Sequence, residues 1–295
     1  MDDEAALAAQ AFEHHRTHLR SVAYRMLGSI SEADDAVQEA WLRLARSDTG
    51  DVRNLRAWLT TVVARVCLDM LRSRSARREQ PLDDVQLPDP VVTPISATDP
   101  EEQAVLADSV GLALLVVLDT LSPNERLAFV LHDIFGVPFE QIGSILDRSE
   151  DAAKQLASRA RGRLRGAPVP PVDVRKHREV VDAFLAASRS GDFDGLLAVL
   201  HPDVVLRADA GSGPFGPSLV VRGAEAVVAQ ATRYAGLAKY ARPVLVNGLP
   251  GFAVVRDGVV LSLLSAHVDD GRIVELDIIA DPERLRRLGV ADAIG

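Results

Sequence analysis

The amino-acid sequence predicts two all-α helical domains, the second with a helix-turn-helix, followed by an α+β domain with a curved antiparallel sheet. Three observations support this fold class. Apolar residues recur at helical spacing in the first half of the chain. Proline-rich stretches interrupt the pattern over residues 80–99 and 167–173. Beyond the second stretch, alternating apolar runs separated by Asp-Gly pairs indicate strands. These breaks place the domains at residues 5–79, 100–166 and 174–295.

The first domain is expected to contain three helices. Apolar residues from Phe12 to Leu27 follow a helical period, which Gly28 ends. Ser31 is expected to start the second helix, with Asp34 three residues later in a capping-box arrangement. The third helix is expected to begin near Asn54 and to run into a cluster of arginines.

The next two segments are a linker and a pair of capped helices. Residues 80–99 carry prolines among Asp, Thr and Ser, which is typical of an extended, mobile linker. Asp99-Pro100-Glu101 is a good helix start, and the apolar pattern that follows continues to Leu121. Ser122 is expected to cap another helix, which ends near Gly136.

The segment Pro138–Arg165 predicts two short helices joined by a tight turn at Asp147-Arg148-Ser149. Ser149 can cap the second helix, and Glu150 and Asp151 lie in its first turn, where the helix dipole favours negative charge. That helix becomes steadily more basic. The layout is typical of a helix-turn-helix, whose second helix enters the major groove of DNA. The alternative interpretation is a solvated amphipathic helix that is rich in arginine.

The third domain is expected to begin with helices over 174–190 and 192–200, and to have another helix over 223–234. Asp257-Gly258 and Asp270-Gly271 are expected to form hairpin turns. The expected strands are Val204–Asp209, Leu219–Arg222, Pro243–Val246, Phe252–Arg256, Val259–Asp269 and Arg272–Ala280.

Composition excludes several classes of protein. The chain has 295 residues, 47% of them hydrophobic, and no apolar run long enough for a membrane span. The first residues, MDDEAALAAQAFEHH, lack the pattern of a signal peptide. Cys67 is the single cysteine, so an intramolecular disulfide is excluded. A cytoplasmic protein without cofactor or metal is expected.

The distribution of charge indicates how such a protein reaches DNA. The net charge of −9 argues against an autonomous, high-affinity DNA binder, because phosphate neutralisation supplies most non-specific affinity. Basic residues are instead concentrated in residues 65–78 and 148–165. Basic patches on an acidic body are consistent with delivery to DNA by a partner protein.

Motifs along the whole chain resemble one family when taken in order. In the helical part they are AYRMLGS (23–29), EADDAVQEAWLRL (32–44), NLRAWLTTVVARVCLDMLRSRSARRE (54–79), LSPNERLAFVLHDIFGVPFEQIGSIL (121–146) and the helix-turn-helix. In the last part they are HPDVVLRAD (201–209), VRG (221–223), NGLPGFAVVRDG (247–258) and DPERLRRL (281–288). Together they resemble the bacterial extracytoplasmic-function sigma factors with a fused SnoaL-like C-terminal domain.

The resemblance implies a transcription initiation factor that is not an enzyme. Such a factor binds core RNA polymerase, recognises upstream and downstream promoter elements and promotes DNA opening. Its own C-terminal domain is expected to modulate this activity. The alternatives are a small-molecule-sensing regulator, with a ligand in the C-terminal cone, and a bifunctional protein with enzymatic activity there. Two departures stand out: the family's Gly-rich stretch is the looser Asp209–Gly213, and Gln86-Leu87-Pro88 replaces its Trp-Leu-Pro element, which weakens the expectation of linker docking.

The resemblance also assigns roles to residues. Contact with core polymerase is expected at Asp34, Asp35, Gln38, Glu39, Trp41 and Leu42. Contact with the downstream element and the melted strand is expected at Arg53, Asn54, Arg56, Trp58, Arg65, Arg72, Arg74 and Arg77. Contact with the upstream element is expected at Arg148, Ser149, Lys154, Gln155, Ser158, Arg159 and Arg161. The C-terminal regulatory motifs supply Asp209, Gly211, Gly213, Asp281, Pro282 and Leu285.

For the polymerase-binding set and the DNA-melting set, a purely structural role is the alternative interpretation. The acidic helix face can be merely solvated, and Trp58 can belong to the core rather than serve as a platform for bases. For an enzyme in the C-terminal cone, His267 and Asp277 could face a pocket because they lie within expected strands. The other acid–base candidates are His201, Asp209, Tyr234 and Tyr240.

Overall fold

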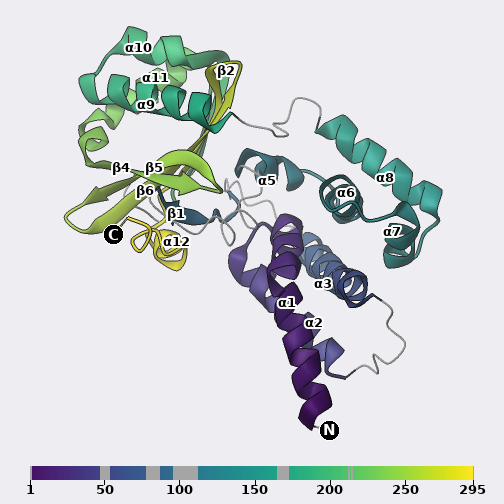
Figure 1. Cartoon of the computed structure of the whole chain (residues 1–295). Coiled ribbons are helices and arrows are strands. Elements are labelled where there is room, and N and C mark those ends of the chain that lie inside the picture. The colour runs from purple at the N-terminus through teal and green to yellow at the C-terminus, as the bar shows by residue number, and fades with distance from the viewer. Residues whose placement is uncertain are drawn as a thin grey trace. The chain divides into compact units, whose positions relative to one another are not determined.

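The computed structural model describes residues 2–46, 54–77, 87–95, 112–164, 173–211, 213 and 215–294 (Figure 1). The chain divides into two compact units. The first comprises Met1–Pro81 and Val117–Ala167, and the second comprises Leu82–Val116 and Pro168–Gly295. The first predicted helical domain and the part of the second from Val117 onward therefore belong to one compact unit, whereas residues up to Val116 belong to the other. None of the described helices has the length and apolar character needed to span a bilayer.

The first half of the chain is helical, as predicted. Its elements are α1 (Asp2–Leu27), α2 (Ile30–Leu44), α3 (Leu55–Arg77), α5 (Leu112–Leu118), α6 (Pro123–Phe129), η1 (Val130–Ile134), α7 (Phe139–Leu146) and α8 (Glu150–Arg163). Gly28 ends α1 with a φ of 70°. The expected start of α2 at Ser31 is wrong by two residues, because Ser29 is the N-cap and its hydroxyl accepts from the Glu32 amide. The helix start expected at Asp99-Pro100-Glu101 lies outside the described residues.

The helix-turn-helix forms as predicted, on α7 and α8. Ser122 and Glu125 make a reciprocal capping box at the start of α6. Ser149 caps α8 by accepting from the Ala152 amide at 3.2 Å. Asp147 ends α7 in the left-handed conformation, with a φ of 53°. The segment Val130–Ile134 is a π-helix, where the sequence predicted a continuous α-helix.

The helices before and after the linker pack together within the first unit. Arg126 of α6 is 2% exposed, and its Nε donates to the carbonyl of Arg25 in α1 at 3.2 Å. Its guanidinium also pairs with Asp119. The Phe135 ring lies edge-on to His18, with the ring centroids 5.5 Å apart, and 5.2 Å from the guanidinium carbon of Arg25.

The second unit is built on a sheet with strand order β1-β4-β5-β6-β7-β2-β3. Its strands are β1 (Val92–Pro94), β2 (Leu200–Asp209), β3 (Leu219–Arg222), β4 (Ala241–Val246), β5 (Leu249–Arg256), β6 (Val259–Asp269) and β7 (Arg272–Ile279). Its helices are α9 (Val174–Ser190), α10 (Phe193–Val199), α11 (Ala224–Arg233), η2 (Ala235–Tyr240) and α12 (Pro282–Arg287). Neighbouring strands are antiparallel except β2 and β7, which are parallel.

Three tight turns join β4, β5, β6 and β7. Both predicted Asp-Gly turns are present, with positive φ at Asp257, Gly258, Asp270 and Gly271, as type I′ hairpins require. Asn247-Gly248 forms a third turn of the same kind, with φ values of 50° and 75°. These turns fix which residues of neighbouring strands pair, and the pleat of each strand places its alternate residues on opposite faces of the sheet.

The two faces of this sheet carry separate cores. Figure 1 shows α9, α10 and α11 on one side of the sheet and α12 on the other, while β1 is the edge strand beside β4. The core on the first face combines Phe252 and Leu276 of the sheet with Phe184 of α9. The second buries Ile279 and Leu285 with residues of β4, β5 and β6.

The linker is only partly as predicted, because its described part is extended but docked on the second unit. Val92 of β1 pairs with Val246 of β4. The Val91 amide donates to the Asn247 side-chain oxygen at 2.7 Å, and the Asn247 amide donates back to the Val91 carbonyl at 2.8 Å. Leu87 is 3% exposed and belongs to the core of the second face. The missing Trp of the family element therefore does not prevent docking.

Candidate polymerase, DNA and regulatory surfaces

The predicted polymerase-binding residues lie on α2. Asp35, Gln38 and Leu42 are exposed at helical spacing on one face, and Leu42 is an exposed large apolar side chain. Asp34 is also exposed and pairs with Arg20 of α1 at 2.6 Å. A helix face that carries carboxylates, an amide and one apolar side chain is complementary to a partner surface rich in basic residues.

The two remaining predicted polymerase contacts are less available. Trp41 is half-buried, and its ring lies 5.2 Å from that of Phe12. Glu39 is paired with Arg43 one turn further along α2, at 2.9 Å. Trp41 therefore helps to hold α2 on α1.

The predicted melting residues are distributed along α3. Asn54 caps the helix, because its side-chain oxygen accepts from the Ala57 amide at 3.0 Å. Trp58 is half-buried. Burial and the nearby charge of Arg56 lower the pKa of His18 to about 4, so its neutral Nδ1 accepts from Arg56 at 3.2 Å. Arg53 and the side chain of Arg77 lie outside the described residues.

Three arginines of α3 point toward acceptors within the first unit. Arg65 donates to the carbonyl of Ser144 in α7 at 3.1 Å. Arg72 donates to the side chain of Asn124 in α6 at 3.2 Å. Arg74 pairs with Glu32 of α2. In these contacts the guanidinium groups donate to protein acceptors. The same N–H donors could otherwise bind DNA phosphates.

The predicted upstream-element residues lie on α8 and the turn before it. Arg148, Lys154, Gln155 and Ser158 are exposed. Lys154 pairs with the side chain of Glu150 at 2.8 Å. The capping role of Ser149 orients α8, because its hydroxyl is engaged by the helix's own backbone.

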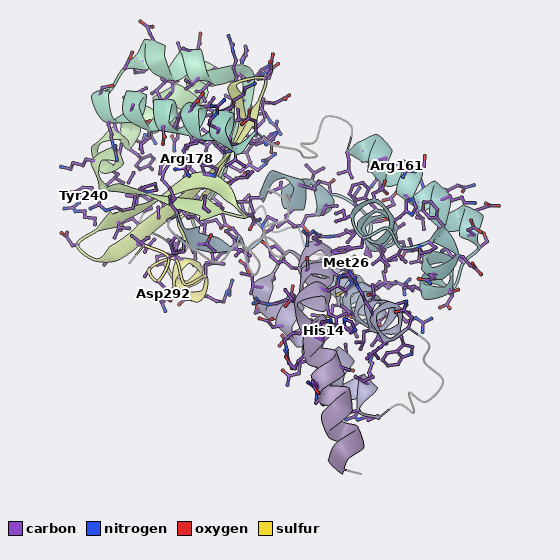
Figure 2. The ribbon with its side chains drawn as sticks, viewed as in Figure 1. His14, Met26, Arg161, Arg178, Tyr240 and Asp292 are labelled. Atoms are coloured by element: carbon purple, nitrogen blue, oxygen red, sulfur yellow. The ribbon has the colours of Figure 1, made fainter. Side chains whose placement is uncertain are left out.

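The two arginines predicted further along α8 are tied to neighbouring elements. The guanidinium of Arg161 contacts Asp133 of η1 at 2.8 Å, and Figure 2 labels Arg161 on this helix. Arg159 is 63% exposed and lies 3.9 Å from Glu125. Both remain on the surface of α8, with side chains long enough to reach a phosphate.

A buried arginine holds the linker on the C-terminal unit. The Nε of Arg284 donates to the carboxylate of Asp89 at 2.8 Å, and its terminal nitrogens donate to Asp209 and to the Leu87 carbonyl. The Leu87 amide in turn donates to Asp209 at 3.2 Å. Arg284 is 8% exposed. Burial raises the pKa of Asp209, while the charge of Arg284 acts in the opposite direction.

The predicted regulatory motifs meet beside this arginine. Asp281 caps α12, and Pro282 occupies its first turn. A Cβ on Gly211 would overlap the Asp281 carboxylate, and Gly211 has a φ of 49°. A Cβ on Gly213 would meet two backbone carbonyl oxygens at 2.7 and 2.8 Å. Leu285 is 2% exposed in the core of the second face.

Sequence reasoning missed Arg284, Leu87 and Asp89 as members of this site. Arg284 lies 195 residues from Asp89 along the chain, so no local pattern joins them. The available signal was the position of Arg284 inside the DPERLRRL motif, on the first turn of a capped helix.

The acid–base candidates of the C-terminal unit are not gathered in a pocket. Asp277 pairs with Arg207 at 3.1 Å, and burial raises the pKa of Asp277 to about 6. The expectation that Asp277 and His267 could face the pocket is wrong. Leu276 and Ile278 line the cavity of this unit, so Asp277 between them points to the other face, and His267 of β6 is not among the described lining residues.

The other candidates are similarly placed. Tyr234 lies on the cavity wall, whereas Asp209 holds the linker. His201 lies within β2, where its Nδ1 accepts from the Asp203 amide at 3.1 Å. Tyr240 ends η2 and lies outside the cavity lining.

Comparison with known proteins agrees with this arrangement. Sigma-70 region 2 matches residues 11–77, and Sigma-70 region 4 matches residues 111–164. The chain is 42% identical over 288 residues to the ECF RNA polymerase sigma factor SigJ of Mycobacterium tuberculosis, covering 92% of this chain and 91% of that protein. It is 37% identical over 279 residues to the probable ECF RNA polymerase sigma factor SigI of the same species, covering 93% of both.

A solved structure extends the likeness to all parts of the chain. The crystal structure of Mycobacterium tuberculosis SigJ matches with a TM-score of 0.75 at 40% identity, covering 94% of this chain and 98% of that one. The two sigma-70 regions and the helix-turn-helix define a transcription initiation factor of the sigma-70 class. Within that class, the chain belongs to the extracytoplasmic-function RNA polymerase sigma factors, and its C-terminal α+β unit is built on a mainly antiparallel sheet.

Proposed function

We propose that this sigma factor directs core RNA polymerase to promoters in the cytoplasm, through two helical surfaces. The exposed face of α2 at Asp35, Gln38 and Leu42 contacts polymerase. The capped helix α8 contacts the upstream element with Gln155 and its basic neighbours, since Gln and Arg can read base edges and basic side chains also position the helix on phosphates.

The basic side of α3 contacts the downstream element and the melted strand. Arg65 and Arg72 are exposed and extended toward single acceptors on α7 and α6. Phosphates are stronger acceptors for a guanidinium than a neutral carbonyl or amide oxygen. Promoter binding would therefore replace these two contacts and loosen the packing of α3 against α6 and α7.

The C-terminal unit regulates transcription by holding the linker between the two sigma regions. The observation that carries this proposal is the buried contact of Arg284 with Leu87, Asp89 and Asp209, together with the pairing of β1 and β4. A linker fixed at this point limits how the two sigma regions can be placed on a promoter. Regulation therefore acts through the attachment of the linker.

The C-terminal unit has no catalytic role in this proposal. The described lining of its cavity contains no acidic, basic or histidine side chain. General acid–base catalysis needs a proton donor or acceptor within hydrogen-bond reach of the reacting atoms, and the hydroxyl of Tyr234, the acid–base candidate on the described wall, already donates to the Phe215 carbonyl at 3.2 Å.

Transcription in vitro with purified core polymerase tests the proposal. The full chain should yield promoter-dependent transcripts, and the truncation ending at residue 170 should yield a different amount. Arg284→Met should change the yield in the same direction as the truncation, whereas Arg286→Met, on the exposed side of α12, should match the wild type. Absence of transcripts on a diverse promoter library, with no binding to core polymerase, would refute the sigma role. Equal yields from all four proteins would refute only the regulatory role.

A further inference from the structure

A cavity of about 140 Å³ lies in the C-terminal unit. Its walls come from β2, β5, β6 and β7 on one side and from α9, α11 and η2 on the other. These helices cover the face of the sheet opposite to α12 (Figure 1). The cavity is thus separate from the contact of Arg284 with the linker, and the described residues of its wall all fall within 184–280.

The wall is apolar and carries no charge. Aromatic rings of Phe184, Phe215 and Phe252 line it with aliphatic side chains, and none of the described lining residues is ionisable at neutral pH. Two wall hydroxyls are already engaged: Ser188 donates to a backbone carbonyl of α9 at 2.8 Å, and Tyr234 donates to the Phe215 carbonyl at 3.2 Å. A charged ligand would lose its hydration here without gaining a partner of opposite charge.

Two polar side chains remain on the wall. Gln230 of α11 and Ser262 of β6 are both half-buried lining residues. An amide and a hydroxyl can satisfy one or two neutral polar groups of a ligand, such as a hydroxyl or a carbonyl. The wall therefore suits a neutral molecule that is mostly apolar.

The volume sets the size of the ligand. In another protein, an apolar cavity of about 150 Å³ stays dry and binds benzene. A cavity of about 140 Å³ accordingly accommodates one aromatic ring with small substituents.

Part of the cavity wall comes from residues that follow β2, namely Ala210, Phe215 and Pro217. Phe215 packs edge-on against Tyr234, with the ring centroids 5.8 Å apart. The Ala210 amide donates to the Ser218 hydroxyl at 3.2 Å, which ties the two ends of the loop together. Gly211, near the start of the loop, packs against Asp281.

We propose that this cavity binds an uncharged, mainly apolar molecule of about the size of one substituted aromatic ring. The inference goes beyond the sigma activity and does not depend on polymerase or promoter binding. It identifies the C-terminal unit as a receptor for a small hydrophobic compound.

The experiment uses the full chain and two fluorinated probes observed by ¹⁹F NMR. 4-Fluorotoluene is neutral, and 4-fluorobenzoate places a carboxylate on the same ring. The neutral probe should bind in a saturable manner, and the charged probe should bind at least about tenfold more weakly, because its charge has no partner in the wall. Failure of the neutral probe to bind up to its solubility limit, or equal binding of both probes, would overturn the proposal.

Matched variants on one helix locate the binding site. Ala231 lines the cavity from α11, whereas Ala229 is exposed on the same helix. Ala231→Leu should weaken binding of 4-fluorotoluene at least about tenfold by filling the cavity, and Ala229→Leu should leave it within about twofold. Circular dichroism checks folding, and Ala238→Leu in η2 replaces the first variant if that one fails to fold. Undiminished binding in a folded cavity-filling variant would place the probe elsewhere and refute the site.

Discussion

Arg284→Met tests whether a single buried cation holds the linker on the C-terminal unit. Methionine keeps much of the apolar length of the side chain but removes the three contacts that Arg284 makes with Asp89, Asp209 and the Leu87 carbonyl. The side chains of Asp89 and Asp209 are each 10% exposed, so the variant leaves two carboxylates nearly buried without their main cation. Removal of one partner from a buried pair costs about 3–5 kcal/mol. We expect a loss of that size in the free energy that holds residues 87–95 on the sheet.

Native-state hydrogen exchange of the full chain measures this loss directly. The Leu87 amide donates to Asp209 and the Val91 amide donates to Asn247, so both report on docking. A loss of about 3–5 kcal/mol accelerates their exchange by roughly two to four powers of ten. Both tryptophans, Trp41 and Trp58, lie in the first unit, so unchanged tryptophan emission shows that this unit stays folded.

Two further variants separate the charge pair from other effects. Arg286→Met removes an exposed arginine from the same helix and should leave the exchange rates unchanged. Adding Asp89→Asn and Asp209→Asn to Arg284→Met should recover part of the loss, because the uncompensated charges are then gone. Exchange of the Leu87 and Val91 amides at the wild-type rate in Arg284→Met would refute the reasoning.

Four other predictions concern single residues. The native pKa of Asp277 is raised from 3.8 to about 6, so the native state binds the proton of this carboxyl group more tightly than the unfolded state does. The stability that this protonated group contributes is therefore lost as the pH rises from about 4 to 6. Asp277→Asn should therefore gain stability relative to wild type by about 3 kcal/mol over that range in urea unfolding followed by circular dichroism, and a pH-independent difference would contradict this. A Cβ on Gly143 would lie 2.8 Å from the Arg148 carbonyl, so Gly143→Ala should destabilise the helix-turn-helix by about 1–3 kcal/mol and weaken promoter binding in gel-shift assays with polymerase. Leu42→Ala should weaken binding to core polymerase by up to about tenfold in surface plasmon resonance without lowering the melting temperature, since Leu42 is exposed. Gln155→Ala should relax base preference at one upstream position by about 1–3 kcal/mol in a promoter-variant library, whereas uniform weakening across all variants would assign Gln155 to the phosphates.

The features that the sequence predicted well are determined by neighbours in the chain. Ser122 and Ser149 cap their helices because the residues that they need lie within three positions. The hairpin at Asp257-Gly258 follows from the positive φ that two adjacent residues must adopt. The one misplaced cap has a similar origin. Ser29 competes with Ser31, and Ser29 has a glutamate at the third position, which is the better capping-box partner.

The features that could not be predicted depend on contacts between distant segments. Strand β1 has three residues and ends in Pro94, so its own pattern is that of a linker. Its strand conformation comes from pairing with β4, more than 140 residues later in the chain. Similarly, alternation along β7 separates Asp277 from Leu276 and Ile278, but only the placement of α9 and α11 decides which of the two faces holds the cavity.

Strand β1 also protects the C-terminal unit from unwanted assembly. It forms one edge of the sheet, where its Pro94 pairs with Val244 of β4. Pro94 has no amide hydrogen that a further strand could use. When the linker dissociates from the sheet, β4 becomes the edge strand. It then presents unpaired backbone groups beside the apolar residues Val244 and Val246. Such an edge is a template for pairing with another chain. Release of the linker therefore gives the C-terminal unit a tendency to self-associate, and a fragment that begins after residue 172 carries that open edge from the start.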